Sequence, residues 1–479
     1  MKAEGTWTPP SVGTTVSGDA VVIVPGIMGS RLVHAETGRV LWGVGKAARY
    51  LARWGHREGL AELAVTPRER DGHVGRIVPD GLLDTVEWAP VLKGIEPYGR
   101  LVDRIGRALP HPRALLPFAY DWRLSVDFNA DRLAAALRTH LDGWRDHASR
   151  PRGPEPKAVI VAHSMGGLVA AAMCARHPDL AAEVRATVTL GTPFLGAVKA
   201  VGMLNTGRGM ALERRNLRDL ARTLPAVHDL LPDPAYRCVL TGDDHVVALG
   251  EADAVALGAD RDLFQRSRRS RASWAPARLP GHRPVIGTGQ PTDQSLRLRD
   301  GAAELLPHGF VRDPDDELRR DPFGRPQPVD HRGDGTVFRY SAAPPGMPDA
   351  TTLGQQHGAL ARTRSVLDIV RGVVDRIDPG AALGDDDGDG EAIGLRVPDT
   401  AGAGQRFEIA IDRVRAAGRV SVLVEDALRD RRPVARPVPH RGDDPEGLVA
   451  AVVLDEPGLY RIAVSDGSDP VTQIVLVRD

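Results

Sequence analysis

Ser164 lies between an apolar run and a stretch with helix-forming composition. The run 158–161 predicts a buried strand, and residues 168–173 predict a helix. This strand, turn and helix order is typical of a nucleophile elbow, a strained turn that exposes a serine hydroxyl above a parallel sheet. The two chain segments approach closely there, and the chain offers the small residues Ala162 and Gly166 on either side. Ala162 departs from the commoner glycine, and a plain strand-to-helix turn is the alternative.

A nucleophilic serine needs a general base and a carboxylate that orients the base. Asp334 stands between two glycines, and His357 follows it in the chain. The chain has 15 histidines, so a histidine near an aspartate is weak evidence by itself. The order Ser, Asp, His is the order of this architecture and favours the assignment. We therefore predict that His357 takes the proton of Ser164 and that Asp334 fixes its tautomer.

The same chemistry needs two backbone amides that bind an oxyanion. The apolar run 20–24 leads into a loop whose glycines at 26 and 29 allow a close approach to a substrate. We predict that one donor is the amide of Met165 and that the other is the amide of Ile27 or, as an alternative, of Met28. An ordinary strand-to-loop turn is the competing interpretation of this loop.

Four ordered segments resemble the lecithin:cholesterol acyltransferase family of α/β-hydrolases: 24–30, 120–124, 163–167 and 191–196. Segment 224–232 also resembles the lid region of bacterial members. The resemblance covers roughly residues 20–377. It implies a mostly parallel sheet flanked by helices, a cap, and a triad of Ser164, Asp334 and His357 with oxyanion amides at Ile27 and Met165. The family transfers an acyl group from a phospholipid ester, through an acyl-serine, to an alcohol or to water.

Two other polar features near these motifs are interpreted as structural. Asp121, Trp122 and Arg123 belong to the second motif, and a buried Asp–Arg pair beside a tryptophan more often braces a loop than performs chemistry. His163, next to the nucleophile, is interpreted as a packing residue. The three chemical roles are filled without them.

Composition limits the classes of protein that remain. With 479 residues and 42% hydrophobic residues, the chain is long enough for one large domain and a small one. A net charge of −1 argues against nucleic acid as a partner. The two cysteines, Cys174 and Cys238, make no disulfide framework. No signal-peptide apolar region and no run of 18 apolar residues is present, so we expect a cytoplasmic protein, with a removed leader left open. No metal or other cofactor is expected.

The predicted domains are an N-terminal extension (1–19), a catalytic domain (20–377) with a cap at about 195–284, an acidic Gly/Asp linker (378–393) and a β-sandwich (394–479). Within the catalytic domain we expect a helix at 131–141, a strand near 285–287 and a closing helix at 363–374. The linker imitates the start of a calcium loop at Asp385, Asp387 and Asp389, but position 12 would be Arg396, so a flexible linker is favoured.

Short strands separated by turns are predicted beyond the linker, at 406–411, 420–424, 448–454, 459–464 and 472–477. An immunoglobulin-like sandwich fits this spacing, and other β folds stay open. A chain that ends near Gly390 is expected to fold and to hydrolyse soluble esters, because the linker composition marks an independent boundary and every predicted catalytic residue precedes it.

Two features of the catalytic region suggest lipid contact and have bland alternatives. Tryptophans at 42, 54 and 88 favour a membrane-facing or cap insertion as much as an ordinary core. The basic cluster 266–271 beside Trp274 could bind anionic headgroups, although a solvated loop is the better interpretation.

The sequence thus predicts a serine lipid esterase or O-acyltransferase. Its expected partners are a lipid or ester substrate, transiently a membrane surface, and a protein bound through the β-sandwich. The alternatives are a carboxylesterase for soluble esters or an interaction module on a hydrolase scaffold.

Overall fold

The protein is described from a computed structural model. The structure describes residues 17–43, 60–83, 98–207, 214–274, 278–299, 301–313, 315, 317–344, 346–347, 350–376, 392–414, 417–427, 432–442 and 447–478.

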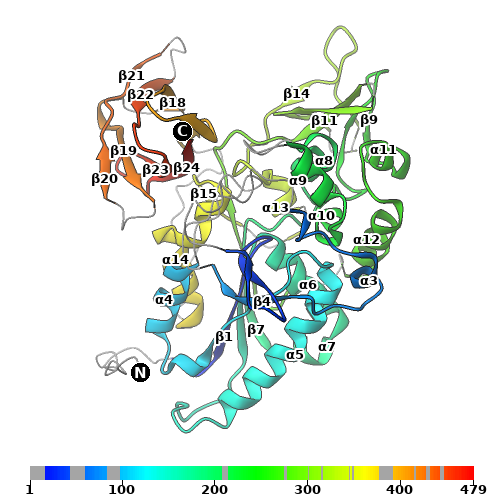
Figure 1. Ribbon diagram of the computed structural model, residues 1–479, viewed down its shortest axis with the longest axis vertical. Helices are drawn as coiled ribbons and strands as arrows, with labels where there is room; N and C mark the ends of the chain where they lie inside the picture. Colours follow the sequence, from blue (N-terminus) through cyan, green and yellow to red (C-terminus); the bar gives the residue numbers. More distant parts are fainter. Residues whose placement is uncertain are drawn as a thin grey trace.

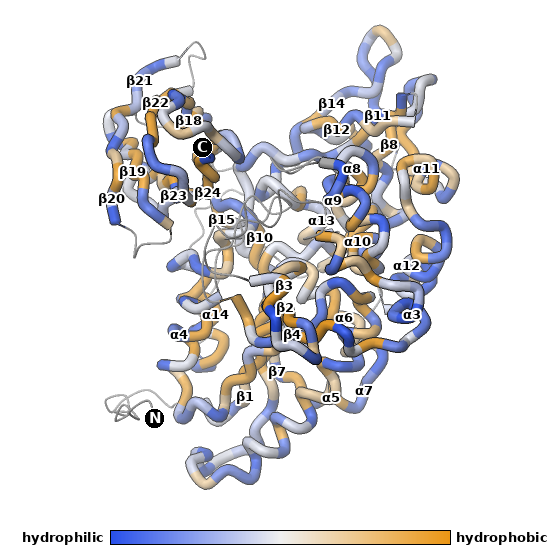
Figure 2. Tube along the Cα trace, viewed as in Figure 1, coloured by the Kyte–Doolittle hydropathy of each residue, from blue (hydrophilic) through white to orange (hydrophobic). Residues whose placement is uncertain are grey.

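A six-stranded parallel sheet forms the centre of the molecule, in the order β15-β10-β7-β6-β1-β5. The strands are β1 (Ala20–Val24), β5 (Leu115–Pro117), β6 (Ala158–His163), β7 (Val184–Leu190), β10 (His282–Gly287) and β15 (Thr351–Leu353). Every residue of β1 and β6 is buried, as expected for continuous apolar runs covered on both faces. Figure 2 shows mostly hydrophobic colours along β1. The strand predicted near 285–287 is β10 and is confirmed.

Helices cover both faces of this sheet. Figure 1 shows α4 (Gly99–Ala108) and α14 (Arg364–Val374) on one side, and α5 (Val126–Arg145) and α6 (Met165–Arg176) on the other. The short helix α7 (Pro178–Ala181) follows α6. Helix α5 begins after Ser125, whose side chain caps the amide of Phe128, and it contains the predicted helix 131–141. The predicted closing helix is α14. The architecture is therefore the mixed α/β arrangement that the sequence predicts.

A small antiparallel sheet, β3-β2-β4, follows β1 and packs beside the motif around Trp122. It consists of β2 (Ser30–His34), β3 (Val40–Trp42) and β4 (Ile77–Leu82), with the short helix α3 (Pro67–Arg70) before β4. The Trp42 ring lies edge-on to Trp122 with ring centroids 5.3 Å apart, and its Nε1 donates to the Met28 carbonyl at 2.7 Å. Trp42 is thus a core residue, whereas residues 54 and 88 lie outside the described residues.

A second lobe stands beside the carboxyl ends of the central strands (Figure 1). Before β10 it includes α8 (Val198–Thr206), α9 (Arg214–Ala221), α10 (Pro225–Asp229), β8 (Arg237–Leu240), β9 (Val246–Ala248), α11 (Glu251–Ala256) and α12 (Arg261–Trp274). After β10 it adds β11 (Ser295–Arg299), β12 (Ala302–Leu306), β13 (Gly309–Phe310) and β14 (Pro328–Val329). Strands from both groups join in one sheet, β12-β11-β8-β9. The lobe therefore extends beyond residue 284, the predicted end of the cap.

The remaining short elements of the catalytic region are η1 (Pro112–Ala114), α13 (Arg339–Ala342) and η2 (His357–Arg362).

Two further sheets make up the C-terminal β unit, and their inward side chains share one core. One sheet contains β16 (Gly394–Arg396), β18 (Arg406–Asp412), β22 (Leu448–Val453) and β21 (His440–Arg441). The other contains β17 (Thr400–Gly402), β24 (Val471–Arg478), β23 (Gly458–Ser465), β19 (Ser421–Asp426) and β20 (Pro433–Ala435), with η3 (Ala417–Arg419) before β19. The five predicted strands are confirmed as β18, β19, β22, β23 and β24. The immunoglobulin-like topology stays a prediction.

The C-terminal β unit packs on the catalytic region. Leu459, Ile474 and Leu476 belong to the same hydrophobic cluster as the central sheet. Most of the predicted linker, including Asp385, Asp387 and Asp389, lies outside the described residues. The premise that the linker marks an independent boundary is contradicted by this shared core. A chain that ends near Gly390 would expose the shared apolar surface, and its folding and activity stay a prediction.

The two ends of the catalytic region are held together by a buried carboxylate. Asp19 accepts hydrogen bonds from Arg185 Nε at 2.6 Å, from Arg376 at 3.0 Å and from the Lys157 amide at 3.0 Å. Burial alone would raise the pKa of Asp19, but the bonds from Arg376, the Lys157 amide and Arg185 outweigh burial and lower the pKa.

None of the helices in the described ranges is long and apolar enough to cross a bilayer.

Candidate active site

The predicted elbow is present between β6 and α6. The backbone of Ser164 has φ 52° and ψ −127°, a conformation that residues other than glycine rarely adopt. Its amide donates to the Leu190 carbonyl at 2.8 Å. Gly166 is needed because a Cβ there would lie 2.5 Å from the carbonyl oxygens of Val24 and Pro25. The elbow is therefore pressed directly against the end of β1.

The three residues predicted as a triad are brought together in one hydrogen-bonded line. His357 Nε2 lies 2.9 Å from Ser164 Oγ, and His357 Nδ1 lies 2.6 Å from Asp334 Oδ2. Each of the three side chains is at most 3% exposed. The His357 amide also donates to the Asp334 carbonyl at 2.8 Å, so backbone and side chain both join the acid and base loops.

The carboxylate of Asp334 is held from its other side by the turn in which it stands. Its Oδ1 accepts from the amides of Thr336 at 3.0 Å and Val337 at 2.7 Å, which leaves Oδ2 aimed at His357. The Gly335 amide donates to Thr292 Oγ1 at 2.8 Å and fixes the turn further. The two glycines that flank the aspartate in the sequence are thus part of a compact, hydrogen-bonded turn.

The loop after β1 lies against the nucleophile, as predicted for an oxyanion loop. A Cβ on Gly26 would lie 2.9 Å from Ser164 Cβ, so glycine is required for this approach. Among the described residues, neither the Ile27 amide nor the Met165 amide donates a hydrogen bond to another protein group. Both residues are buried. Met28, the alternative donor, has a positive φ of 65°.

His163 and Tyr98 form a hydrogen-bonded chain that sequence reasoning missed. The Gly26 amide donates to Tyr98 Oη at 2.9 Å, and Tyr98 Oη lies 2.7 Å from His163 Nδ1. His163 Nε2 lies 3.0 Å from the carbonyl oxygen of His357. Because burial, reinforced by the neighbouring His357, lowers the pKa of His163 to about 3, the ring is neutral. Tyr98 then donates to Nδ1 and Nε2–H donates to His357, which connects the oxyanion loop to the base.

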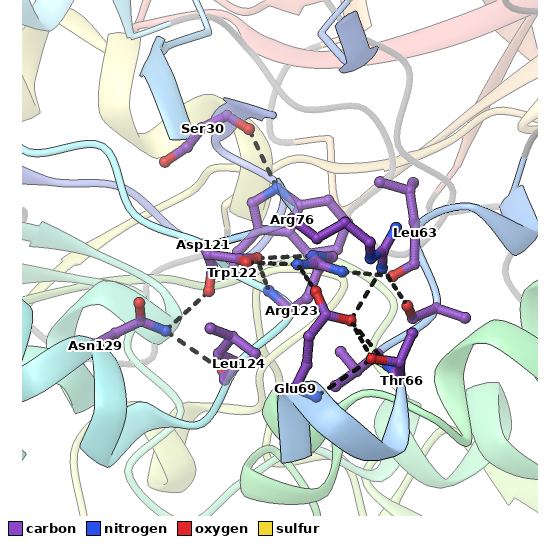
Figure 3. Close-up of polar contacts among 12 residues, drawn as sticks. Ser30, Leu63, Thr66, Glu69, Arg76, Asp121, Trp122, Arg123, Leu124 and Asn129 are labelled. Carbon is purple, nitrogen blue, oxygen red and sulfur yellow. Dashed lines mark hydrogen bonds and ion pairs between the residues drawn. The ribbon is translucent and has the colours of Figure 1, made fainter. Parts of the chain in front are cut away.

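Arg123 is the centre of a buried ion cluster (Figure 3). It binds Asp121 through Nε at 2.9 Å and through a second nitrogen at 2.7 Å, and it binds Glu69 at 3.1 Å. The side chains of Arg123, Asp121 and Glu69 are 1%, 6% and 2% exposed. Burial alone would raise the pKa of Glu69, but the Thr66 amide, Arg123 and Arg76 lower it to about 2. This geometry supports the interpretation of the motif as a brace.

The basic cluster 266–271 is neither a loop nor wholly solvated, because it lies within α12. Arg271 is 3% exposed and donates to the Phe194 carbonyl at 2.6 Å and to the Asp229 carbonyl. Arg271 therefore ties the segment 191–196 to the segment 224–232. The expectation of a solvated loop is wrong, because the helical spacing of Ser267, Arg271 and Trp274 turns these residues inward.

Comparison with known proteins shows a similarity to one family. Residues 78–249 match the sequence profile of the Lecithin:cholesterol acyltransferase family. The match covers less than half of the chain and is a similarity to that family. The match includes Ser164 and the segments 120–124, 191–196 and 224–232, and it ends before Asp334 and His357. The resemblance inferred from the sequence is confirmed.

One curated relative is the Saccharomyces cerevisiae "Uncharacterized protein YJR098C", which is 31% identical over 185 residues. The alignment covers 38% of this chain and only 24% of that relative.

Three solved structures were compared. The Bacillus licheniformis lipase BlEst2 in propeptide form is 12% identical, with 98% of this chain and 95% of that chain covered and a TM-score of 0.30. The metagenomic carboxyl esterase MGS0156 is 16% identical, with 58% and 52% covered and a TM-score of 0.21. A superoxide reductase from Ignicoccus hospitalis is 15% identical, with 18% and 80% covered and a TM-score of 0.15. None of these superposes closely enough to define the fold of this chain.

Proposed function

We propose that this protein is a serine-dependent acyl-ester hydrolase or O-acyltransferase that acts on phospholipid-type esters. The observation that carries the proposal is the line from Ser164 Oγ to His357 Nε2 at 2.9 Å and from His357 Nδ1 to Asp334 Oδ2 at 2.6 Å. The match of residues 78–249 to an acyltransferase family supports acyl transfer as the class of reaction.

The proposed reaction follows from which atoms can hold the proton. Ser164 Oγ attacks the ester carbonyl while its proton passes to His357 Nε2, and Asp334 stabilises the imidazolium. The amides of Ile27 and Met165 donate to the developing oxyanion. His357 then returns the proton to the leaving alcohol, which leaves an acyl-Ser164. Water or a second alcohol then loses a proton to His357 Nε2 and attacks this ester. The bond between the acyl carbon and Ser164 Oγ breaks, His357 returns the proton to Oγ, and the acyl group leaves as acid or as a new ester.

The nucleophile is tested by Ser164→Ala. The variant should fold as the wild type does and lose hydrolysis of p-nitrophenyl butyrate and p-nitrophenyl palmitate. In the wild type, a p-nitrophenyl alkylphosphonate should add one phosphonyl group to Ser164, located by peptide mass spectrometry. Hydrolysis retained in Ser164→Ala would refute the assignment.

The substrate class is tested with labelled phosphatidylcholine vesicles, with and without millimolar alcohols. We expect phospholipid turnover, with free fatty acid exceeding acylated alcohol, because water reaches any acyl-serine that is not sealed from solvent. Turnover of short soluble esters alone would instead identify a carboxylesterase. An excess of acylated alcohol would identify a transferase.

A further inference from the structure

The first described residues of the C-terminal β unit lie directly against the loops that carry Asp334 and His357. A Cβ added to Gly289, after β10, would lie 2.8 Å from Ala392 Cβ. A Cβ added to Gly354, after β15, would lie 2.6 Å from the same atom. The segment that leads into β16 is therefore seated on the ends of two central strands, and only glycines at these two positions leave room for it.

Gln290 joins β16 to the loop of Asp334. Its side chain donates through Nε2 to the Ile393 carbonyl at 2.8 Å and accepts through Oε1 from the Leu395 amide at 3.1 Å. Its own amide donates to the Gly333 carbonyl at 2.8 Å, beside Asp334. Gln290 is 1% exposed, so these bonds have no competition from water.

Gln356, the residue before His357, meets the same strand. Its Nε2 donates to Gln290 Oε1 at 2.9 Å and to the Leu395 carbonyl at 3.3 Å. Because Gln356 is also buried, one shared amide contact links the acid loop, the base loop and β16. Both bonds come from Gln356 Nε2, and its Oε1 is buried without a hydrogen-bond partner among the described residues.

A second contact holds the base loop from β24. Gln355 accepts through Oε1 from the Thr472 amide at 3.2 Å and from the Gln356 amide at 2.9 Å, and it donates through Nε2 to the Pro470 carbonyl at 3.0 Å. Just after the loop, Asp469 accepts from the amide and the hydroxyl of Ser365, at 2.9 and 2.6 Å. The base loop thus hydrogen-bonds to both sheets of the β unit, to one through β16 and to the other through β24.

We propose that the C-terminal β unit is a brace for the active site and that Gln290, Gln355 and Gln356 are positioning residues that act through Asp334 and His357. The proposal rests on the proposed function. A base must stay within about 0.5 Å of its productive position, and a displacement of about 1 Å costs on the order of 10²-fold in rate. The buried amide contacts supply that restraint from a part of the chain that contributes no reacting group.

The test compares Gln356→Leu with a matched control, Gln473→Leu. Gln473 is 2% exposed, and its side chain also donates to a backbone carbonyl, that of Val397, at 2.9 Å. This bond stays within the β unit, because Gln473 and Val397 both belong to it. Both variants lose a buried amide contact of the same kind. We expect Gln356→Leu to lower kcat by about 10²-fold with KM within about twofold, and Gln473→Leu to leave kcat at the wild-type value.

Gln355→Leu is a milder variant should Gln356→Leu not fold. Gln355 lines a cavity of about 490 Å³ between α4, α14 and the β unit, so a leucine has space there. The same split between kcat and KM is expected, with a smaller loss.

Hydrogen exchange gives a readout that needs no activity. The His357 amide, which donates to the Asp334 carbonyl, should exchange faster in Gln356→Leu and at the wild-type rate in Gln473→Leu. Unchanged exchange with unchanged kcat, or equal loss of kcat in both variants, overturns the brace. Faster exchange in a protein whose wild type hydrolyses no ester keeps the brace and overturns the proposed function instead.

Discussion

Replacing Arg123 with methionine is expected to destabilise the protein strongly, because two carboxylates are buried around it. Methionine keeps an unbranched stem but removes the guanidinium that binds Asp121 and Glu69. All three side chains are at most 6% exposed, so water cannot take the place of the lost cation. Breaking a buried ion pair from one side costs about 3–5 kcal/mol of unfolding free energy.

Arg176→Met is the control that isolates burial from geometry. Arg176 binds Asp131 through Nε at 2.9 Å and a second nitrogen at 2.7 Å, the same distances by which Arg123 binds Asp121. The Arg176 and Asp131 side chains are 37% and 46% exposed, however. An exposed pair contributes at most about 1 kcal/mol to the free energy of unfolding. In urea denaturation at pH 7, Arg123→Met should therefore lose several times more unfolding free energy than Arg176→Met.

The pH dependence gives the sign of the effect. The wild-type pKa of Glu69 is lowered to about 2, so its stabilising contribution is complete above its usual value of 4.5 and is lost as the pH falls through about 2. Without Arg123, burial is opposed only by the Thr66 amide and Arg76, so the pKa of Glu69 should rise from about 2. The variant's loss of unfolding free energy relative to the wild type should therefore shrink as the pH is lowered from 7 to 4. A loss below about 1 kcal/mol, or one equal to that of Arg176→Met, would refute the brace interpretation of this motif.

Two further substitutions test other buried features. Burial raises the pKa of Asp229 to about 6, so its contribution to the free energy of unfolding is complete below about pH 3.8 and is lost as the pH rises through 6. In urea denaturation, the wild type should therefore lose on the order of 3 kcal/mol of unfolding free energy between pH 4 and 8, and Asp229→Asn should not show this loss. Parallel pH profiles of the two proteins would contradict this. Gly166→Ala should destabilise the elbow and abolish ester hydrolysis, because the new Cβ would lie 2.5 Å from two carbonyl oxygens. Gly143→Ala in α5, which has open space around it, should be neutral or stabilise the protein by up to about 1 kcal/mol. Equal behaviour of the two variants in activity and thermal-melt assays would show that the close approach at Gly166 does not matter.

Local chemistry in the sequence is sufficient for the candidate residues and for most elements of the central sheet. The elbow is recognisable because a strand, a small-residue turn and a helix stand in consecutive positions around Ser164. Asp334 and His357 could be selected from many acids and histidines because chain order restricts the choice. Three strands of the β unit, β18, β19 and β22, alternate buried residues with more exposed ones, which a sequence displays directly, whereas β23 and β24 are buried along most of their length.

What the sequence does not display is pairing between distant segments. Strands β8 and β11 are parallel neighbours although β10 of another sheet lies between them in the chain, so the extent of the second lobe could not be predicted. Gln290, Gln355 and Gln356 are ordinary polar residues in a sequence, and only the fold turns their amides toward β16 and β24. The acidic composition of the predicted linker suggests that the catalytic region and the β unit are independent. Composition describes the linker alone, however, and says nothing of the surfaces that it connects.

The contact between Asp19 and Arg376 holds the first and last described segments of the catalytic region side by side. Residues 20–375 leave and return at one place, because the bonds of Asp19 to Arg376 and Arg185 hold the two ends within hydrogen-bonding distance. Neighbouring ends are the geometry that tolerates circular permutation and insertion of one domain into another. The region could therefore be carried as an insert within a longer host chain with no strand of its central sheet having to change neighbours, provided that the C-terminal β unit still covers the apolar surface that the two share.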